Sequence, residues 1–257
     1  MLLDDEAGAA LAEAAVERVL AGARVLVSGG TTGIGRAVVA LLARAGARLL
    51  IFGRHEGELA DALKNAGLDA TAGLAADSSQ AEDVEHVFRA LDERLGGIDI
   101  FVACAALGAD PLHEMEEDAW RYVVETNLIG YLACARGAIK RMQRSGGGHL
   151  LFVSSISPEI KAPGESVYAA TKGGVNAFAE TLRKEVAGDK IKVTVIEPGS
   201  VGSDMQECSL DEQRKAIARH EMLYAEEIAE AILFALTRSA RCDVLGMRVE
   251  PRLQKTG

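Results

Sequence analysis

The sequence predicts an α/β fold in which a mostly parallel, seven-stranded sheet carries helices on both faces. Short apolar runs rich in Val, Ile and Leu alternate along the chain with longer helical stretches. Strands that are apolar throughout are buried on both faces, and their alternation with helices indicates parallel pairing through right-handed crossovers. No Pro/Ser-rich linker and no internal repeat interrupts the pattern. We therefore expect one doubly wound domain.

The elements follow one another in a regular order. The expected strands are Val25–Ser28, Leu49–Phe52, Ala70–Leu74, Ile100–Ala103, His149–Ser154, Lys192–Ile196 and Asp243–Val249. The expected helices cover residues 34–45, 56–66, 80–95, 117–144, 167–187 and 226–238. Ahead of the first strand, residues 7–20 have apolar positions at helical spacing. We interpret residues 1–22 as an accessory helix, a cap or frayed tail rather than a specific interface, and residues 23–257 as the domain.

Composition restricts the function. The chain has 257 residues, of which 49% are hydrophobic, and its net charge of -10 with no basic stripe argues against nucleic acid as a partner. The four cysteines are scattered, with no Cys/His cluster, so neither a metal site nor a disulfide framework is expected. No apolar run approaches the roughly 20 residues that cross a bilayer, and the acidic start is unlike a signal peptide. We expect a cytoplasmic protein without membrane contact.

A glycine-rich turn between the first strand and the first helix indicates a dinucleotide site. Gly29, Gly33 and Gly35 follow a Gly-x-x-x-Gly-x-Gly spacing. Glycine permits the tight turn and the close approach of backbone to a pyrophosphate, which the N–H groups of the following helix attract. The alternative is an ordinary glycine-rich turn, but the flanking strand and helix favour a Rossmann-type site. The loop residues expected to contact the cofactor are Gly29, Thr31, Thr32, Gly33, Ile34 and Gly35.

The end of the second strand indicates which dinucleotide binds. NAD sites place an acid there for the ribose hydroxyls, whereas this sequence reads Phe52-Gly53-Arg54-His55. A guanidinium suits a 2′-phosphate through its charge and its fork of donors. We therefore expect NADP(H) as the preferred cofactor, with NAD(H) possible. In the alternative interpretation, Arg54 merely begins the next helical region and Glu56 serves the ribose.

Tyr168 and Lys172 are the strongest candidates for chemistry. Four residues apart, they share one face of a helix. A free phenol has a pKa of about 10, and a nearby cation lowers that value. The pair therefore suits general acid–base work on an alcohol or a carbonyl. Alone, the spacing occurs by chance in many surface helices.

The complete motif set resembles the short-chain dehydrogenase/reductase family, in its compact single-domain branch. The resemblance covers about residues 23–250, and Ser155 precedes Tyr168 by the usual 13 residues. The motifs, in the family's order, are the glycine loop 28–35, Asp77, Asn127, Ser154-Ser155, Tyr168-x-x-x-Lys172 and Pro198-Gly199. The closing run 243–251 is similar, more weakly, to NADP-dependent carbonyl and 3-hydroxy-acid reductases.

The resemblance implies a role for each matching polar residue. Tyr168 would donate the proton in reduction and accept it in oxidation. Lys172 would lower the pKa of Tyr168 and hold the nicotinamide ribose. Ser155 would hydrogen-bond the substrate oxygen where charge develops. Asn127 would hold a water that links Lys172 to solvent, whereas without the family match an Asn inside a helix is solvated or bonded to backbone.

The resemblance also implies further cofactor contacts and one departure. Asp77 would meet the adenine amino group, with an N-cap for the next helix as the alternative or additional role. The other residues implied to contact the cofactor are Ala105, Tyr168, Lys172, Pro198, Gly199, Val201 and Ser203. Where relatives often read Asn-Asn-Ala-Gly, residues 103–106 read Ala-Cys-Ala-Ala. The extra methyl group of Ala106 puts the local fit of the cofactor in doubt.

These residues predict an NADP(H)-dependent oxidoreductase that interconverts a ketone or aldehyde and an alcohol. One alternative is a catalytically idle dinucleotide-binding sensor or scaffold on the same fold. Another is an isomerase, dehydratase or epimerase, although such relatives carry a longer C-terminal substrate region. The substrate site should involve residues 104–115, 156–167 and 200–224, which are mostly apolar and offer no evident arginine for a carboxylate. The resemblance implies a homotetramer or homodimer through helices 117–144 and 167–187.

Overall fold

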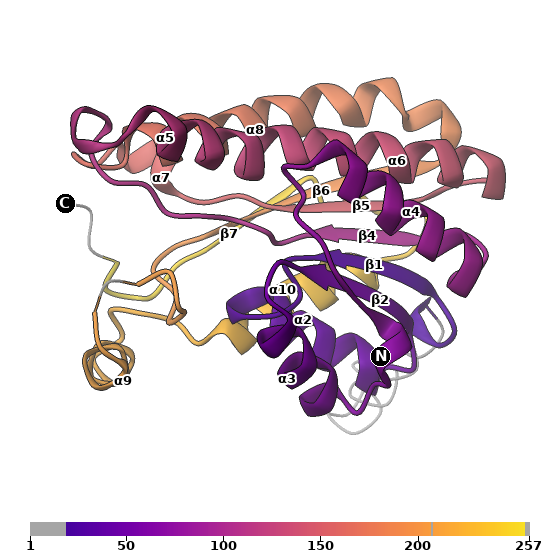
Figure 1. Cartoon of the computed structure of the whole chain (residues 1–257), viewed down its shortest axis with the longest axis horizontal. Helices are drawn as coiled ribbons and strands as arrows, with labels where there is room; N and C mark the ends of the chain where they lie inside the picture. The colour runs from indigo at the N-terminus through magenta and orange to yellow at the C-terminus, as the bar shows by residue number, and fades with distance from the viewer. Residues whose placement is uncertain (1–18, 207, 255–257) are drawn as a thin grey trace, which may run out of the picture.

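The computed structural model describes residues 19–206 and 208–254, which form a seven-stranded sheet between two layers of helices (Figure 1). The strands are β1 (Arg24–Ser28), β2 (Arg48–Gly53), β3 (Gly73–Ala75), β4 (Ile100–Ala103), β5 (Gly148–Val153), β6 (Ile191–Pro198) and β7 (Gly246–Val249). Their order across the sheet is β3-β2-β1-β4-β5-β6-β7, and every neighbouring pair is parallel. The predicted doubly wound fold is confirmed, and its strand order reverses between β1 and β4, where such sheets bind ligands.

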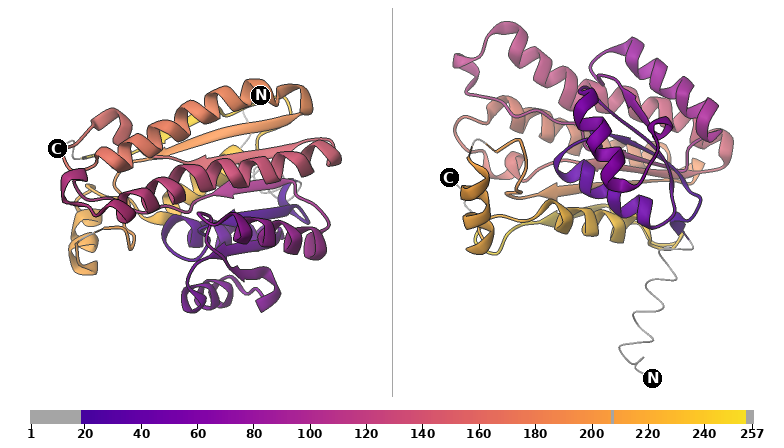
Figure 2. Two further views of the ribbon diagram at one scale, coloured as in Figure 1. Left: turned by 45° about the horizontal axis from the view of Figure 1, so that its top comes forward. Right: turned by 60° about the horizontal axis from the view of Figure 1, so that its bottom comes forward.

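The helices divide between the two faces of the sheet. One face carries α2 (Gly33–Arg44), α3 (Glu56–Ala66) and α10 (Ala225–Leu236). The other carries α4 (Ala81–Leu95), α5 (Glu117–Val124), α6 (Gly130–Ser145) and α8 (Ser166–Glu185), as Figures 1 and 2 show from three directions. The short helix α7 (Ser157–Ile160) and helix α9 (Leu210–Ala218) follow the ends of β5 and β6. Within the described residues, no helix is both long and apolar enough to span a bilayer.

The sheet separates two apolar cores because its central strands are buried on both sides. Alternate residues of one strand contribute to different cores: Leu26 faces the core under α4, α6 and α8, whereas Val25 and Val27 face the core under α2, α3 and α10. Burial on both faces explains why β4 and the middle of β1, residues 25–27, are apolar. The two layers hold the carboxyl ends of the strands at one rim.

Three expected elements differ from the structure. The expected strand Ala70–Leu74 is a 3-10 turn at Ala70–Ala72 followed by β3, because the Asp69 carboxylate accepts the Thr71 amide and holds the turn. The expected helix 117–144 is divided by a π-helical segment, Glu125–Ile129. The expected strand Asp243–Val249 begins only at Gly246. The predicted accessory helix lies almost wholly outside the described residues.

Candidate active site

The glycine turn after β1 fits closely against the chain after β4. A Cβ atom at Gly29 would lie 2.5 Å from both the Cα and the backbone nitrogen of Ala105, and the φ angle of Gly29 is +64°. A Cβ at Gly35 would overlap the carbonyl oxygen of Gly29. Only glycine can occupy either position without displacing backbone. The turn is therefore built by backbone-to-backbone packing; the spacing predicted the tight turn but not its contact with Ala105.

The N-terminus of α2 is open to an anion. Its N-cap residue, Thr32, makes no side-chain capping bond, and the first turn holds no acidic residue. The first N–H groups of a helix have no partner inside the helix, and the helix dipole adds positive potential there. This end of α2 therefore fits the pyrophosphate of a dinucleotide, a group that helix N-termini commonly bind.

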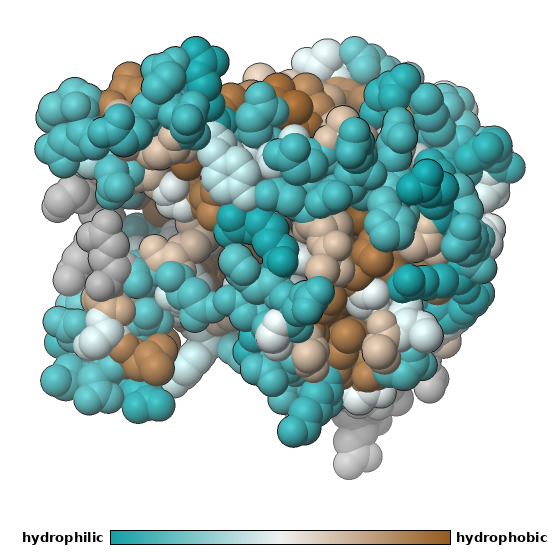
Figure 3. Space-filling model, in the orientation of Figure 1, coloured by the Kyte–Doolittle hydropathy of each residue, from teal (hydrophilic) through white to brown (hydrophobic). Residues whose placement is uncertain are grey.

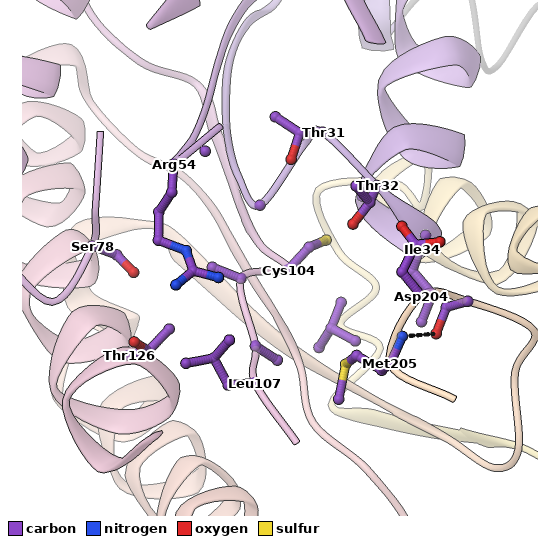
Figure 4. Close-up of a pocket in the computed structure, with 18 of the residues that line it drawn as sticks. Thr31, Thr32, Ile34, Arg54, Ser78, Cys104, Leu107, Thr126, Asp204 and Met205 are labelled. Carbon is purple, nitrogen blue, oxygen red and sulfur yellow. Dashed lines mark hydrogen bonds between the residues drawn. The ribbon is translucent and has the colours of Figure 1, made fainter. Parts of the chain in front are cut away.

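A cleft along the rim of the sheet brings together the ends of β1, β2, β4, β5 and β6. Every residue predicted to contact the cofactor lines this cleft, together with Ser155. Figure 4 shows Thr31, Thr32 and Ile34 on one side and Ser78, Thr126 and Leu107 on the other. The lining residues that were not predicted as cofactor contacts are Phe52, Gly53, His55, Glu58, Ala76, Ser78, Cys104, Ala106, Leu107, Thr126, Val153, Ser154, Asp204, Met205 and Gln206.

At one end of the cleft, Tyr122 connects two of the predicted cofactor residues. Arg54 donates through Nη1 to the Tyr122 hydroxyl at 2.7 Å, and that hydroxyl donates in turn to Oδ2 of Asp77. Burial would raise the pKa of Asp77, but hydrogen bonds from Tyr122 and Ser79 outweigh it and hold the pKa below its ordinary value. Asp77 does not act as the N-cap of α4, since Gln80 occupies that position. Glu56, the alternative ribose partner, begins α3 and does not line the cleft.

The Thr126 hydroxyl is a second sign that this end of the cleft receives a polar group. Thr126 is 4% exposed, lines the cleft, and its Oγ1 atom has no hydrogen-bond partner among the described residues. A buried hydroxyl without a partner is costly and is rare in proteins. Together with the glycine cradle and the open end of α2, it shows that the residues present fit an adenine dinucleotide.

Tyr168, on α8, and Ser155, which follows the end of β5, lie in the same cleft. Burial raises the pKa of Tyr168 to about 12, a hydrogen bond from Ser155 opposes that rise, and the Glu165 carboxylate adds to it. The Ser155 hydroxyl also lies 3.1 Å from that of Ser157, whose backbone amide donates to Ser155 Oγ at 3.1 Å. The shift of Tyr168 is opposite to the one expected from Lys172, so the protein alone keeps this phenol protonated at neutral pH.

Lys172 is buried, with 1% of its surface exposed. Its ammonium donates to the carbonyl of Val153 at 2.9 Å and lies 3.5 Å from the Tyr131 hydroxyl. The ammonium is 5.7 Å from the centre of the Tyr168 ring. Burial lowers the pKa of Lys172 to about 8. The Lys172 ammonium is thus poorly solvated. It lies near the Tyr168 ring, but its hydrogen bond goes to the backbone carbonyl of Val153.

Asn127 is fully buried and does not line the cleft. Its carboxamide accepts the Leu107 amide and donates to the Leu107 carbonyl, both at 2.8 Å. Asn127 belongs to the π-helical segment, whose wider turn changes the direction of the side chains relative to a regular helix. In the structure, Asn127 therefore fastens the segment after β4 to the helix layer. The bound water that the resemblance implies remains a prediction.

The departure at residues 103–106 lies at the glycine turn. Ala105 packs against Gly29, and Ala106 lines the cleft, so the effect of its methyl group on the fit of the cofactor stays a prediction. The thiol of Cys104 lies beside the turn, and burial raises its pKa to about 12. A pKa in this range means that the Cys104 thiol is protonated at neutral pH.

A second cavity adjoins Ser155 and Tyr168 on the side away from the glycine turn. Its lining residues are Gly108, Ala109, Asp110, Pro111, Met115, Ser155, Ile156, Ser157, Ile160, Ala162, Pro163, Gly164, Glu165, Tyr168, Gly199, Ser200, Met205, Gln206, Cys208 and Gln254. Figure 3 shows the surface hollowed between the part that carries α5 and α7 and the part that carries α9. Its charged lining residues, among those described, are Asp110 and Glu165, and no lysine or arginine joins them. The described residues contain no cluster of ligands for a metal ion.

Comparisons with known proteins agree with this geometry. The profile of the short chain dehydrogenase family matches residues 23–214. An uncharacterised oxidoreductase of Staphylococcus aureus is 29% identical over 88% of this chain and 96% of its own length. A 3-oxoacyl-[acyl-carrier-protein] reductase of Vibrio cholerae is 31% identical over 86% of this chain and 92% of its own.

Solved structures agree as well. A variant of the actinorhodin polyketide ketoreductase, crystallised with NADPH, superimposes with a TM-score of 0.78 at 26% identity, covering 90% of this chain and 97% of that one. A short-chain type dehydrogenase/reductase from Mycobacterium ulcerans has the same fold, with a TM-score of 0.78, 24% identity and 90% of each chain covered. The chain belongs to the short-chain dehydrogenase/reductase family and is an oxidoreductase by that membership.

Proposed function

We propose that the protein is an NADP(H)-dependent reductase of ketones or aldehydes, acting in reverse on secondary alcohols. The observation that carries the proposal is that Ser155, Tyr168 and Lys172 line the same cleft as the glycine turn and the N-terminus of α2. A group that exchanges a proton and a site that fits a dinucleotide therefore share one space. The 3-oxoacyl reductase and the ketoreductase with NADPH among the similar proteins support this type of reaction.

The residues of the cleft would divide the binding of the cofactor among them. The N-terminus of α2 would hold the pyrophosphate, Asp77 and Thr126 the adenine, and Arg54 a 2′-phosphate. Segment 198–203 would flank the nicotinamide. The bound reduced nicotinamide would supply hydride to the carbonyl carbon, which is the chemistry that the protein itself lacks.

Tyr168 would supply the proton to the carbonyl oxygen. A pKa of about 12 means that the phenol is protonated at neutral pH, the form that a proton donor needs. Ser155 would hydrogen-bond the same oxygen as negative charge develops on it. Lys172, held by Val153, would favour the phenolate that is left behind, because a positive charge within about 4–6 Å stabilises an anion.

The cavity beside Tyr168 supports an uncharged carbonyl substrate. Its lining includes Met115, Ile156, Ile160 and Met205 together with two acidic residues and no basic one. Negative charge at Glu165 and Asp110 would repel a carboxylate.

We also propose that the protein works in the cytoplasm as a homotetramer or homodimer, with the α5–α6 layer and α8 at the interface. The N-terminal segment 1–22 as an accessory helix stays a prediction.

A single substitution tests the proposed chemistry. Tyr168→Phe removes the hydroxyl and keeps the ring, so reduction of a ketone from a test panel should slow by about a hundred- to ten-thousandfold. NADPH affinity, measured by calorimetry, should stay within about twofold, since the phenol adds little to binding. The matched control is Tyr224→Phe, which removes an exposed hydroxyl outside both cavities.

Two results would contradict the proposal. Near-native turnover by Tyr168→Phe would exclude Tyr168 as the proton donor. NADPH binding to the unaltered protein, without oxidation by any carbonyl compound of a broad panel, would instead favour a dinucleotide-binding sensor or scaffold.

A further inference from the structure

Tyr122 is a polar residue that lies outside the cleft lining yet contacts two side chains inside it. It stands on α5, half-buried, far in sequence from both Arg54 and Asp77. Its hydroxyl lies between the Arg54 guanidinium and the Asp77 carboxylate, and the guanidinium also lies 5.5 Å from the centre of its ring. A ring contact and a hydrogen bond therefore hold Arg54 at once.

The direction of each hydrogen bond follows from the chemistry of the partners. A guanidinium can only donate, and an ionised carboxylate can only accept. The single proton of the Tyr122 hydroxyl must therefore point to Asp77, and its lone pairs must face Arg54. Asp77 is itself fixed, because its other oxygen accepts the Ser79 amide at 2.9 Å. The chain from Ser79 to Arg54 thus has one arrangement of donors and acceptors.

The arrangement leaves most of the guanidinium available. Tyr122 accepts from one Nη1 proton, while the Nε and Nη2 groups of Arg54 donate to no acceptor among the described residues. Figure 4 shows Arg54 reaching from the end of β2 into the cleft, toward the side that carries Ser78 and Thr126. An exposed arginine without such a hold would sample many rotamers, which costs entropy when it orders around an anion.

We propose that Tyr122 is a positioning residue for cofactor discrimination: its hydroxyl orders Arg54 so that the remaining donors of the guanidinium receive the 2′-phosphate of NADP(H). The inference rests on the proposed use of NADP(H) and adds a residue that carries the choice without touching the cofactor. It assigns the preference to three side chains, from the turns after β2 and β3 and from α5, rather than to the residue after β2 alone.

Two nucleotides that differ only in the 2′-phosphate test the inference without turnover. Adenosine 2′,5′-bisphosphate and adenosine 5′-monophosphate would be titrated by calorimetry into the full chain. In Tyr122→Phe the ring remains but the hydroxyl is lost, and we expect about tenfold weaker binding of the bisphosphate, the scale of one hydrogen bond to a charged group. Affinity for the monophosphate should stay within about twofold, which also shows that the adenine end is still folded.

The controls separate this inference from the assignment of the cofactor. Arg54→Ala should weaken the bisphosphate more than Tyr122→Phe does, and Tyr224→Phe should weaken neither nucleotide. An equal loss of both nucleotides in Tyr122→Phe would show a structural role for Tyr122 and overturn the inference, as would no loss at all. If Arg54→Ala also leaves the ratio of the two affinities unchanged, Arg54 does not bind the 2′-phosphate and the role of Tyr122 is overturned as well. If the unaltered protein binds both nucleotides equally, the proposed NADP(H) preference itself is wrong.

Discussion

The two halves of the site are built by different means: the nucleotide side around the glycine turn, and the substrate side around the second cavity. On the nucleotide side, backbone meets backbone: Gly29 packs on Ala105, and its amide donates to the Phe52 carbonyl at 2.9 Å. On the substrate side, side chains hold the loops. The Gln254 carboxamide accepts the Ser200 amide at 2.9 Å and donates to its hydroxyl at 3.1 Å.

This difference indicates which side of the site can tolerate amino-acid substitutions. A turn whose shape depends on missing Cβ atoms tolerates almost no substitution. A loop held by one amide side chain can instead be held by a side chain at another position. In the proposed function, the nucleotide side would bind a cofactor shared by many enzymes, and the substrate side would select the carbonyl compound. Loops on a rigid scaffold commonly carry such specificity.

The largest expected effect comes from adding one methyl group on the nucleotide side. In Gly35→Ala, the new Cβ would overlap the Gly29 carbonyl oxygen and lie 2.8 Å from the Gly29 carbonyl carbon. We expect the free energy of unfolding to fall by about 3 kcal/mol, the upper range for an overpacked site. NADPH binding should weaken by more than about tenfold, because the turn must move. Chemical denaturation and calorimetry measure the two effects.

The matched substitution on the other side is Gly108→Ala. Gly108 lines the second cavity, and a Cβ there would meet nothing within 4 Å. We expect a change in unfolding free energy within about 0.5 kcal/mol. A loss in Gly108→Ala as large as that in Gly35→Ala would contradict the contrast between the two halves.

The fold could be predicted because its signals are local. Each buried strand is a short apolar run, and the glycine turn follows β1 without a gap, so the parallel sheet, the order of elements along the chain and the nucleotide side all follow from neighbouring residues. Helix α9 was missed although its signal was present: Ser209 and Glu212 form a capping box at its start. The π-helical segment has no comparable signal, since the sequence around Asn127 also suits a regular helix.

The sequence predicted site residues that stand in a recognisable motif, but not residues that act through contacts between distant segments. Tyr122 could not be found, because it meets Asp77 across 45 positions and Arg54 across 68. The pKa of Tyr168 was expected to fall on account of Lys172, and burial reverses that shift. Spacing indicated that the two side chains share a helix face, but the depth of the cleft depends on elements that no local pattern describes.

The buried charge of Lys172 gives the next largest effect, and it depends on pH. Burial lowers the pKa of Lys172 from about 10.5 to about 8. Between these values the unfolded chain keeps a proton that the folded protein releases, so stability rises with pH through this window. Relative to Lys172→Met, the unfolding free energy of the native sequence should increase by about 2 to 3 kcal/mol from pH 8 to 10.5.

Comparison with the variant is needed because other groups titrate in the same range. Burial raises the pKa of both Cys104 and Cys134 to about 12, which lowers stability as pH rises above about 9. These thiols are present in both proteins, so their contribution largely cancels in the difference. A difference that stays constant from pH 8 to 10.5 would mean that Lys172 is solvated and not confined by Val153 and Tyr131.

The smallest effect concerns the Ser200 loop, which distinguishes the two halves most directly. Gln254→Ala removes the acceptor of the Ser200 amide, and amide hydrogen exchange at Ser200 should quicken by about fivefold, as expected for one net hydrogen bond. Exchange at Gly29, whose amide is held by backbone, should not change. Gln254→Glu keeps an acceptor oxygen and should restore most of the protection. Faster exchange at both amides would show that the C-terminal segment supports the whole cleft, and that its two sides are not built independently.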